Sequence, residues 1–114
     1  MKGKPTMLPV DLDPRLLYSS TGEDKADDVN FAIGVRGSAP REVRDRIWSS
    51  LASWLTADRA SELLACPCRV VLFPRLQAVN VLAVGKLRDA GFDKQGKGLG
   101  RALIERLEAL RADA

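Results

Sequence analysis

TGEDKADDVNFAIGV, residues 21–35, joins a charged loop to an alternating segment from which the rest of the fold can be inferred. Its second half alternates between large apolar and small residues, and because successive side chains of a β-strand point to opposite sides, this pattern predicts a strand. The apolar set is Val29, Phe31, Ile33 and Val35, and the small set is Asn30, Ala32 and Gly34. We therefore expect a sheet that is apolar on one face and small and polar on the other.

The first half of the same stretch is a charged loop, with the sequence EDKADD at residues 23–28 after Gly22. Loops at the ends of a rigid sheet often present functional groups, so we expect any site to lie near the mouth of this strand. The spacing of the acidic residues matches no EF-hand, and we expect no metal site.

Composition indicates one ordinary domain, because 114 residues with 46% hydrophobic and 29% charged content suffice for a single core. The net charge of +3 is spread among acids, and aromatic residues make up 5%, which argues against nucleic-acid binding. The absence of histidine excludes a Ser-His-Asp triad. Two cysteines, Cys66 and Cys68, are too few for a zinc or iron–sulfur site and predict reduced thiols.

The N-terminal segment, residues 1–13, has no apolar run like the core of a signal peptide, and no later stretch has the length of a membrane span. We expect a cytoplasmic protein that does not contact a membrane. Two prolines and scattered charges predict an irregular arm over residues 1–13, followed by one domain over residues 14–114.

Strands and helices are expected in a repeating order. Residues 15–19 (RLLYS) predict a first strand and residues 29–36 a second. Residues 40–64 have the helical repeat, with Ser38 as a candidate cap and a bend or break near Leu55 and Thr56. Its two tryptophans, Trp48 and Trp54, are expected to serve packing and not ligand binding.

The second half repeats this order. Residues 69–73 and 78–84 are β-branched and apolar and predict two strands, with residues 74–77 as a hairpin-like turn or a bulged corner. Residues 96–110 predict the last helix, because leucine and isoleucine recur on one stripe. The order strand, strand, helix, strand, strand, helix predicts an α+β, ferredoxin-like two-layer sandwich, a small antiparallel sheet with two main helices on one face.

Asn80 lies among apolar residues of the predicted fourth strand. A buried amide without a partner costs about 1–3 kcal/mol, so the side chain either bonds to a loop backbone or meets a ligand. The structural role is favoured, because buried polar side chains usually bond to the backbone.

QGKGLG at residues 95–100 resembles the Gln-x-x-Gly-x-Gly loop with which coenzyme A-dependent acyltransferases hold a diphosphate. Glycines allow close backbone approach, a helix N-terminus supplies free N–H groups, and Lys97 adds charge. The resemblance covers about 20 residues, and such short motifs recur by chance.

A second resemblance covers four segments in order: Gly22 with DK at residues 24–25 and DVN at 28–30; LTADR at 55–59; PRLQAVN at 74–80; and DKQGK at 93–97. Together they are similar to the AtuA-like domain, the C-terminal ferredoxin-fold domain of acyclic terpene utilisation proteins, and to its stand-alone relatives. This resemblance implies an association with acyclic terpene and acyl-CoA catabolism, without a defined catalysed step.

Two functions are therefore expected, in this order. The first is a non-catalytic accessory domain that forms a homo-oligomer or joins a partner subunit of the AtuA N-terminal type. The second is a binding site for an acyl-CoA or another anionic ligand, or a fragment-like acyltransferase that uses the QGKGLG loop; no other cofactor is expected. The ligand-binding candidates are Gly22, Lys25, Asp28, Asn30, Asn80, Gly96, Lys97 and Gly98, and the catalytic candidates are Asp24 as base and Lys25 as electrostatic stabiliser.

Overall fold

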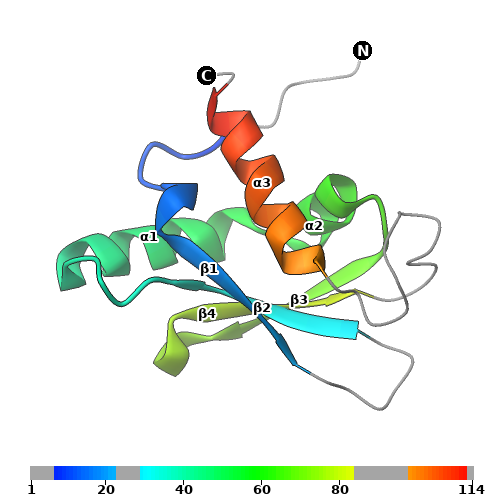
Figure 1. Ribbon diagram of the computed structural model, residues 1–114, viewed down its shortest axis with the longest axis horizontal. Helices are drawn as coiled ribbons and strands as arrows, with labels where there is room; N and C mark the ends of the chain where they lie inside the picture. Colours follow the sequence, from blue (N-terminus) through cyan, green and yellow to red (C-terminus); the bar gives the residue numbers. More distant parts are fainter. Residues whose placement is uncertain (1–6, 23–28, 84–97, 113–114) are drawn as a thin grey trace.

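The computed structural model describes residues 7–22, 29–83 and 98–112. In these residues, a four-stranded antiparallel sheet lies against three α-helices (Figure 1). The strands are β1 (Leu17–Gly22), β2 (Val29–Val35), β3 (Cys68–Phe73) and β4 (Ala78–Ala83). The helices are α1 (Arg41–Trp54), α2 (Ala57–Leu64) and α3 (Leu99–Ala112), with short 3₁₀ turns η1 (Pro14–Leu16) and η2 (Pro74–Leu76). The expected α+β class is confirmed.

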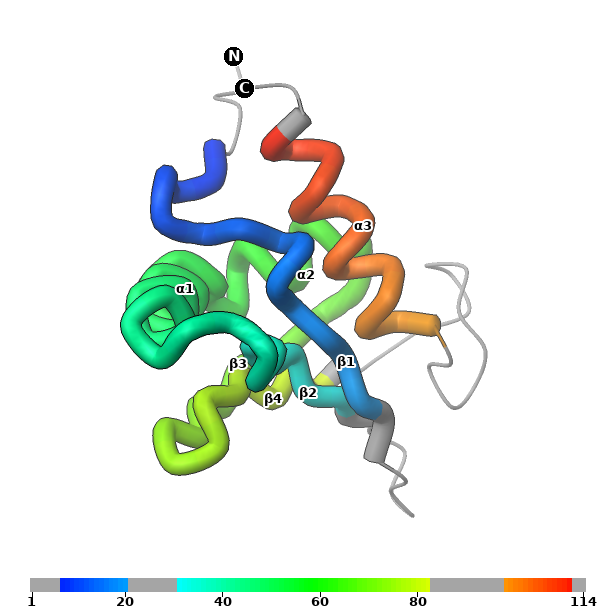
Figure 2. Tube along the Cα trace, turned by 60° about the vertical axis from the view of Figure 1, so that its left-hand side comes forward, coloured from blue at the N-terminus to red at the C-terminus, as the bar shows by residue number. Residues whose placement is uncertain are grey.

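The strand order in the sheet is β1-β2-β4-β3, so β1 and β3 are the two edges. Every neighbouring pair is antiparallel, and the register places Ile33 opposite Ser19 on one side and opposite Val79 on the other. All three helices lie on the same side of this sheet (Figure 2). The molecule therefore has two layers, one of helices and one of strands.

The core lies between these layers and uses the alternation expected from the sequence. Phe31 and Ile33 of β2 are buried together with Val79 and Val81 of β4. The buried side chains that the helices contribute include Ile47, Leu51, Trp54, Leu64, Leu99, Leu103 and Leu107. The predicted stripe on the last helix is confirmed, and Trp54 packs in the core as expected.

The helix predicted over residues 40–64 is broken where expected. Leu55 ends α1, and the Thr56 hydroxyl accepts a hydrogen bond from the backbone N–H of Arg59, as an N-cap does for α2. Ser38, in contrast, was wrongly predicted as the cap of α1. Pro40 occupies the N-cap position without a side-chain hydrogen bond, because the preceding turn leaves Ser38 exposed while Ala39 is buried.

The first strand also begins later than predicted. Asp13 caps η1 by accepting a hydrogen bond from the backbone N–H of Arg15, and Pro14 has the fixed backbone angle that suits a first helical position. Extended structure therefore begins at Leu17 and continues to Gly22. Between β3 and β4, the alternative of a hairpin-like turn is the one observed, since η2 joins two adjacent antiparallel strands.

Residues 7–13, the described part of the N-terminal arm, have no regular secondary structure and pack against the helices. Leu12 is buried in the core, and the indole N–H of Trp54 donates to the backbone oxygen of Met7 at 3.1 Å. Asp13 is joined to Arg15 at 3.0 Å and to Arg111 of α3 at 2.8 Å. These contacts fasten the arm to the end of the last helix.

Candidate functional site

The sheet surface that faces away from the helices is the candidate site, and we call it the open face. It follows from the period of two, because the residues between the buried ones must point to the other side of the sheet. Its described side chains are Tyr18, Ser20, Ala32, Gly34, Arg69, Val71, Phe73, Ala78, Asn80 and Leu82. In the part of the chain that the structure describes, no helix lies on this face.

The two edge strands bring large aromatic and apolar side chains to the open face, together with Ser20 and Arg69, and the residues in its centre include Ala32 and Gly34. Tyr18, Val71 and Phe73 are 37%, 40% and 38% exposed. A Cβ atom added to Gly34 would lie 2.6 Å from atoms of the Tyr18 ring, so this ring lies directly over the glycine backbone. Ala32 is half-buried in the next position of the same strand face. The result is a shallow, largely uncharged surface of the kind that proteins use for contact with other proteins.

Asn80 lies at the middle of this surface, opposite Ala32 of β2 and Val71 of β3. Its side chain is half-buried and forms no hydrogen bond with another described residue. The sequence predicts a buried amide that bonds to a loop backbone or meets a ligand. The position on the open face leaves the Asn80 amide accessible to water or to a docked molecule.

The register places three predicted site residues near one another in the sheet. Gly22 pairs with Asn30, and Asn30 pairs with Leu82, two residues along β4 from Asn80. Gly98 is elsewhere, in the turn that starts α3 on the helix side, where its φ of +84° requires glycine. The remaining candidates, Asp24, Lys25, Asp28, Gly96 and Lys97, lie outside the described residues.

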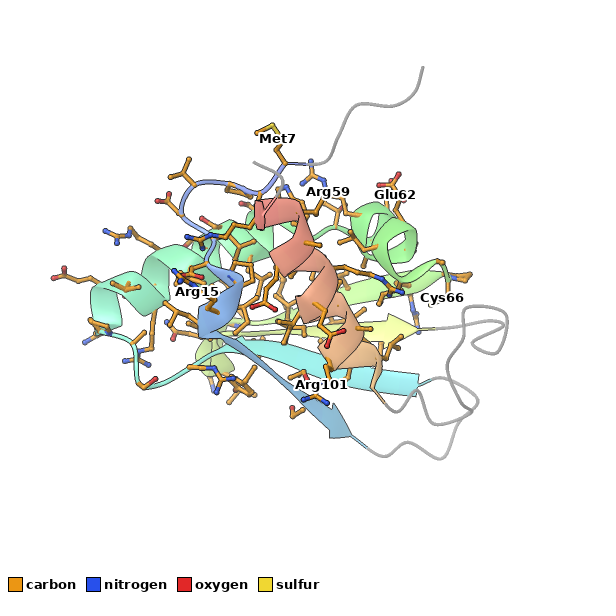
Figure 3. The ribbon with its side chains drawn as sticks, turned by 45° about the horizontal axis from the view of Figure 1, so that its top comes forward. Met7, Arg15, Arg59, Glu62, Cys66 and Arg101 are labelled. Carbon is orange, nitrogen blue, oxygen red and sulfur yellow. The ribbon has the colours of Figure 1, made fainter. Side chains whose placement is uncertain are left out.

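A second feature is a groove of about 580 Å³ beside the β1 edge. Its walls come from η1, β1, Arg36 and the outer side of α3, including Glu105 and Glu108. Arg15 lies on η1 and Arg101 near the start of α3 (Figure 3). This groove could not be predicted from the sequence, because its three arginines come from separate segments and only the packing of α3 on β1 brings them together.

The charges in the groove are partly compensated. Arg15 forms an ion pair with Asp13, and the hydrogen bonds that its guanidinium donates lower the pKa of the Asp13 carboxyl. Glu108 adds a second negative charge near Arg15. Arg36 and Arg101 have no ion pair with another described side chain. The groove therefore offers two guanidinium groups to an anion.

The two cysteines are reduced, as expected, and are not part of either surface. Cys68 begins β3, and its thiol donates to the backbone oxygen of Cys66 at 3.3 Å. Burial raises the pKa of the Cys66 thiol and raises that of Cys68 to about 12. Neither thiol is available as a thiolate at neutral pH, so neither is suited to nucleophilic catalysis.

Within residues 7–22, 29–83 and 98–112, no group of three or more acidic or cysteine side chains is arranged to hold a metal ion. None of the helices found there has the length and apolar character needed to cross a bilayer. Comparison of the chain with protein-family models, with curated proteins and with solved structures gives no match in any of the three.

Proposed function

We propose that this chain is a non-catalytic interaction domain that docks onto a partner subunit through the open face of its sheet. One observation carries the proposal: the helices cover one face of the sheet, while Tyr18, Val71 and Phe73 remain more than one third exposed on the other. Aromatic residues over a small, uncharged centre are typical of the middle of a protein interface. Exposed patches of this kind on a monomer usually mark an interaction site.

The strand order supports the finer fold assignment. In a ferredoxin-like sheet, two strand–helix–strand units interlock so that the strand between two parallel strands belongs to the other unit. Here β2 and β3 are parallel to one another with β4 between them, and α1 and α2 connect them. The order β1-β2-β4-β3 is that of a ferredoxin-like sheet whose last strand has moved to the N-terminal end of the chain.

The resemblance to the AtuA-like domain supports the choice of partner. Its segment at residues 74–80 forms the turn between β3 and β4 and the first half of β4, ending at Asn80 on the open face. We propose a role beside a larger subunit of the AtuA N-terminal type in acyclic terpene or acyl-CoA breakdown. In this role the domain supplies a docking surface, and the larger subunit supplies the chemistry.

The test is a comparison of two alanine positions, Ala32 in the open face and Ala57 on the exposed side of α2. The tagged chain is isolated from its native cell as the wild type, Ala32→Arg and Ala57→Arg, and the mass and stoichiometry of the assembly are measured. We expect one stoichiometric partner with the wild type and Ala57→Arg, and its loss from Ala32→Arg. Retention of the same partner by folded Ala32→Arg would overturn the proposal.

The groove beside β1 favours a second candidate function, the binding of an anionic ligand such as a coenzyme A ester. Arg36 and Arg101 supply charge, and Arg101 lies in the first turn of α3, where the backbone N–H groups have no acceptor within the helix. Binding at a hundredfold excess over Kd raises the free energy of unfolding by about 2.7 kcal/mol. We expect a thermal shift with coenzyme A that disappears in Arg101→Ala and persists in Arg41→Ala, an exposed arginine on α1; no shift in the wild type would eliminate this candidate.

A further inference from the structure

The edge strand β3 has the composition of a strand from the interior of a sheet. Strands that are buried on both faces are apolar in both alternating sets, whereas edge strands usually carry charges that prevent further pairing. Val71 and Phe73 lie on the open face, and Leu72 lies on the helix side, yet Leu72 is 43% exposed. In the adjoining turn, Leu76 is 70% exposed. Apart from Arg69 on the open side, the side chains along this edge are apolar, and Val71, Leu72 and Phe73 are incompletely covered.

The opposite edge, β1, differs in this respect. Its exposed positions include Tyr18, Ser19 and Ser20, and the charged groove runs along it. An uncovered apolar edge occurs only at β3 among the described strands. A strand that pairs with the β3 edge would contact these exposed apolar side chains, so we expect its own side chains to be apolar as well.

The hydrogen-bonding pattern identifies the free backbone groups of β3. In an antiparallel pair, residues alternate between those that bond to the neighbouring strand and those that point away from it. The backbone N–H of Cys68 donates to the Ser61 hydroxyl at 2.8 Å, so Cys68 is a residue that points away from β4. By alternation, Val70 and Leu72 also direct their N–H and C=O groups outward.

The other side of the sheet leads to the same assignment. The backbone N–H of Arg36 donates to the oxygen of Leu16 at 2.8 Å, which makes this a bonded pair between the β1 and β2 segments. The register carries this alternation across the sheet. The even-numbered residues of β2 bond to β1 and its odd-numbered residues bond to β4, so the odd-numbered residues of β3 are the ones that bond to β4. The even-numbered residues of β3 therefore point outward. Two independent hydrogen bonds thus agree that Val70 and Leu72 direct their backbone groups outward at the edge, where no described strand pairs with them.

We propose that the occupant of this edge is a second copy of the chain, whose β3 pairs antiparallel with the first across a twofold axis at Val71. In this register Val70 faces the second copy's Leu72, and the symmetric pair repeats the contact, which gives four backbone hydrogen bonds. Val71 faces itself on the open side. The sheets of the two copies become one eight-stranded sheet.

Charge selects this register over its neighbour. Here Arg69 lies opposite the second copy's Phe73, so no like charges face each other. A shift of the twofold axis to Leu72 would place Arg69 opposite Arg75 and would bring Val70 opposite Pro74, which has no N–H to donate. Both changes weaken the pairing.

The paired region is short, about five residues from each copy and the adjoining turn. Stable interfaces usually bury about 800 Å² on each partner, so this dimer is expected to dissociate readily, with Kd in the micromolar range or weaker. The proposal is independent of docking through the open face, because the edge contact leaves Ala32 and Asn80 uncovered.

A disulfide test follows from the register. Opposite residues in a non-hydrogen-bonded pair have Cα atoms about 4.5 Å apart, within disulfide range. Val71→Cys places the new thiol of one chain directly opposite the new thiol of the second copy. Phe73→Cys is the matched control, because its exposure in the wild type is nearly the same, but the two copies of residue 73 are about 13 Å apart in this register.

We expect mild oxidation of the purified protein to produce the covalent dimer at least about tenfold faster with Val71→Cys than with Phe73→Cys. Cys66 and Cys68 are buried and do not compete. Equal rates would indicate random collision and would overturn the proposal, as would the absence of any dimer from Val71→Cys.

Sedimentation equilibrium over a concentration series provides the second measurement. The wild type and Ala32→Arg are expected to approach twice the monomer mass of 12.4 kDa, whereas Leu72→Lys remains a monomer because its charge lies at the paired edge. Dimerisation of Leu72→Lys at the wild-type concentration, or a monomeric wild type at millimolar concentration, would overturn the proposal. Loss of the dimer in Ala32→Arg would also overturn it and would assign self-association to the open face.

Discussion

The two faces of the sheet share one backbone but differ in what covers them. On the helix side, Phe31, Ile33, Val79 and Val81 are at most 1% exposed. On the open side, Tyr18, Val71 and Phe73 are between 37% and 40% exposed, and the residues between them are small. Stability resides on the helix side, because the free energy of burial scales with the apolar area removed from water. The open side is therefore free to change without loss of the fold, which is the condition for a surface to evolve toward binding.

The largest expected effect on stability comes from comparing a phenylalanine on each face of the sheet. Phe31→Ala should lower the free energy of unfolding by about 3–5 kcal/mol, because it leaves a cavity in the core. Phe73→Ala should lower it by no more than about 2 kcal/mol, since its side chain is already 38% exposed. Urea denaturation of dilute protein gives both values, and equal losses would contradict the division between the two faces.

Two glycines provide the next comparison. A Cβ atom at Gly100 would lie 2.6 Å from the Cβ of Ser19 and 3.0 Å from the Phe31 ring, where α3 meets the sheet. Gly100→Ala should therefore destabilise the fold by about 1–3 kcal/mol, in spite of the better helix propensity of alanine.

On the open face, Gly34→Ala meets the end of the Tyr18 side chain, which can turn away into solvent. We expect a loss of less than about 1 kcal/mol in thermal or urea unfolding, with a change in the NMR signals of the Tyr18 ring. A loss as large as that of Gly100→Ala would show that the open face is packed as rigidly as the core.

A smaller effect is expected at the rim of the helix layer, where Asp13 joins η1 to α3. The pKa of Asp13 is lowered in the folded protein, chiefly by its hydrogen bond from Arg15, so its carboxylate stabilises the fold above the ordinary pKa near 3.8. This contribution is lost as the pH falls through the folded pKa. Asp13→Asn should cost less than about 1 kcal/mol at pH 7 and should reduce the acid sensitivity of unfolding between pH 5 and 2. An unchanged pH profile would contradict this role.

The smallest expected effect is on reactivity, with no change in stability. Because burial raises the pKa of Cys68 to about 12 and also raises that of Cys66, native protein at pH 8 should react with iodoacetamide far more slowly than unfolded protein. Mass spectrometry of the alkylated peptides gives the two rates. Rapid labelling of either thiol in the native state would show that the helix side opens more readily than its burial indicates.

Periodicity was sufficient to predict the elements of this fold, and long-range packing determined the rest. The alternation at residues 29–35 and the stripe of α3 located the core, because each reports burial through neighbours in sequence. The start of β1 was wrong by two residues, since the capping of η1 by Asp13 competes locally with extended structure.

The candidate site was only partly predictable for the same reason. Alternation placed Ala32 and Asn80 on one face, but the groove with Arg36 and Arg101 depends on how α3 crosses β1, and sequence periodicity contains no information on that crossing. The edge position of β3 was equally inaccessible. Its sequence, CRVVLF, is typical of a central strand, and only the register shows that β4 lies inside it.

The contact between Asp13 and Arg111 has a consequence for attachment. It brings the segment before η1 and the last turn of α3 to one corner of the helix layer, on the side of the molecule that faces away from the open face (Figure 1). A linker attached near either position would therefore start from the same corner of the molecule. The domain can thus be attached through this corner while the open face on the opposite side of the molecule stays accessible to a partner.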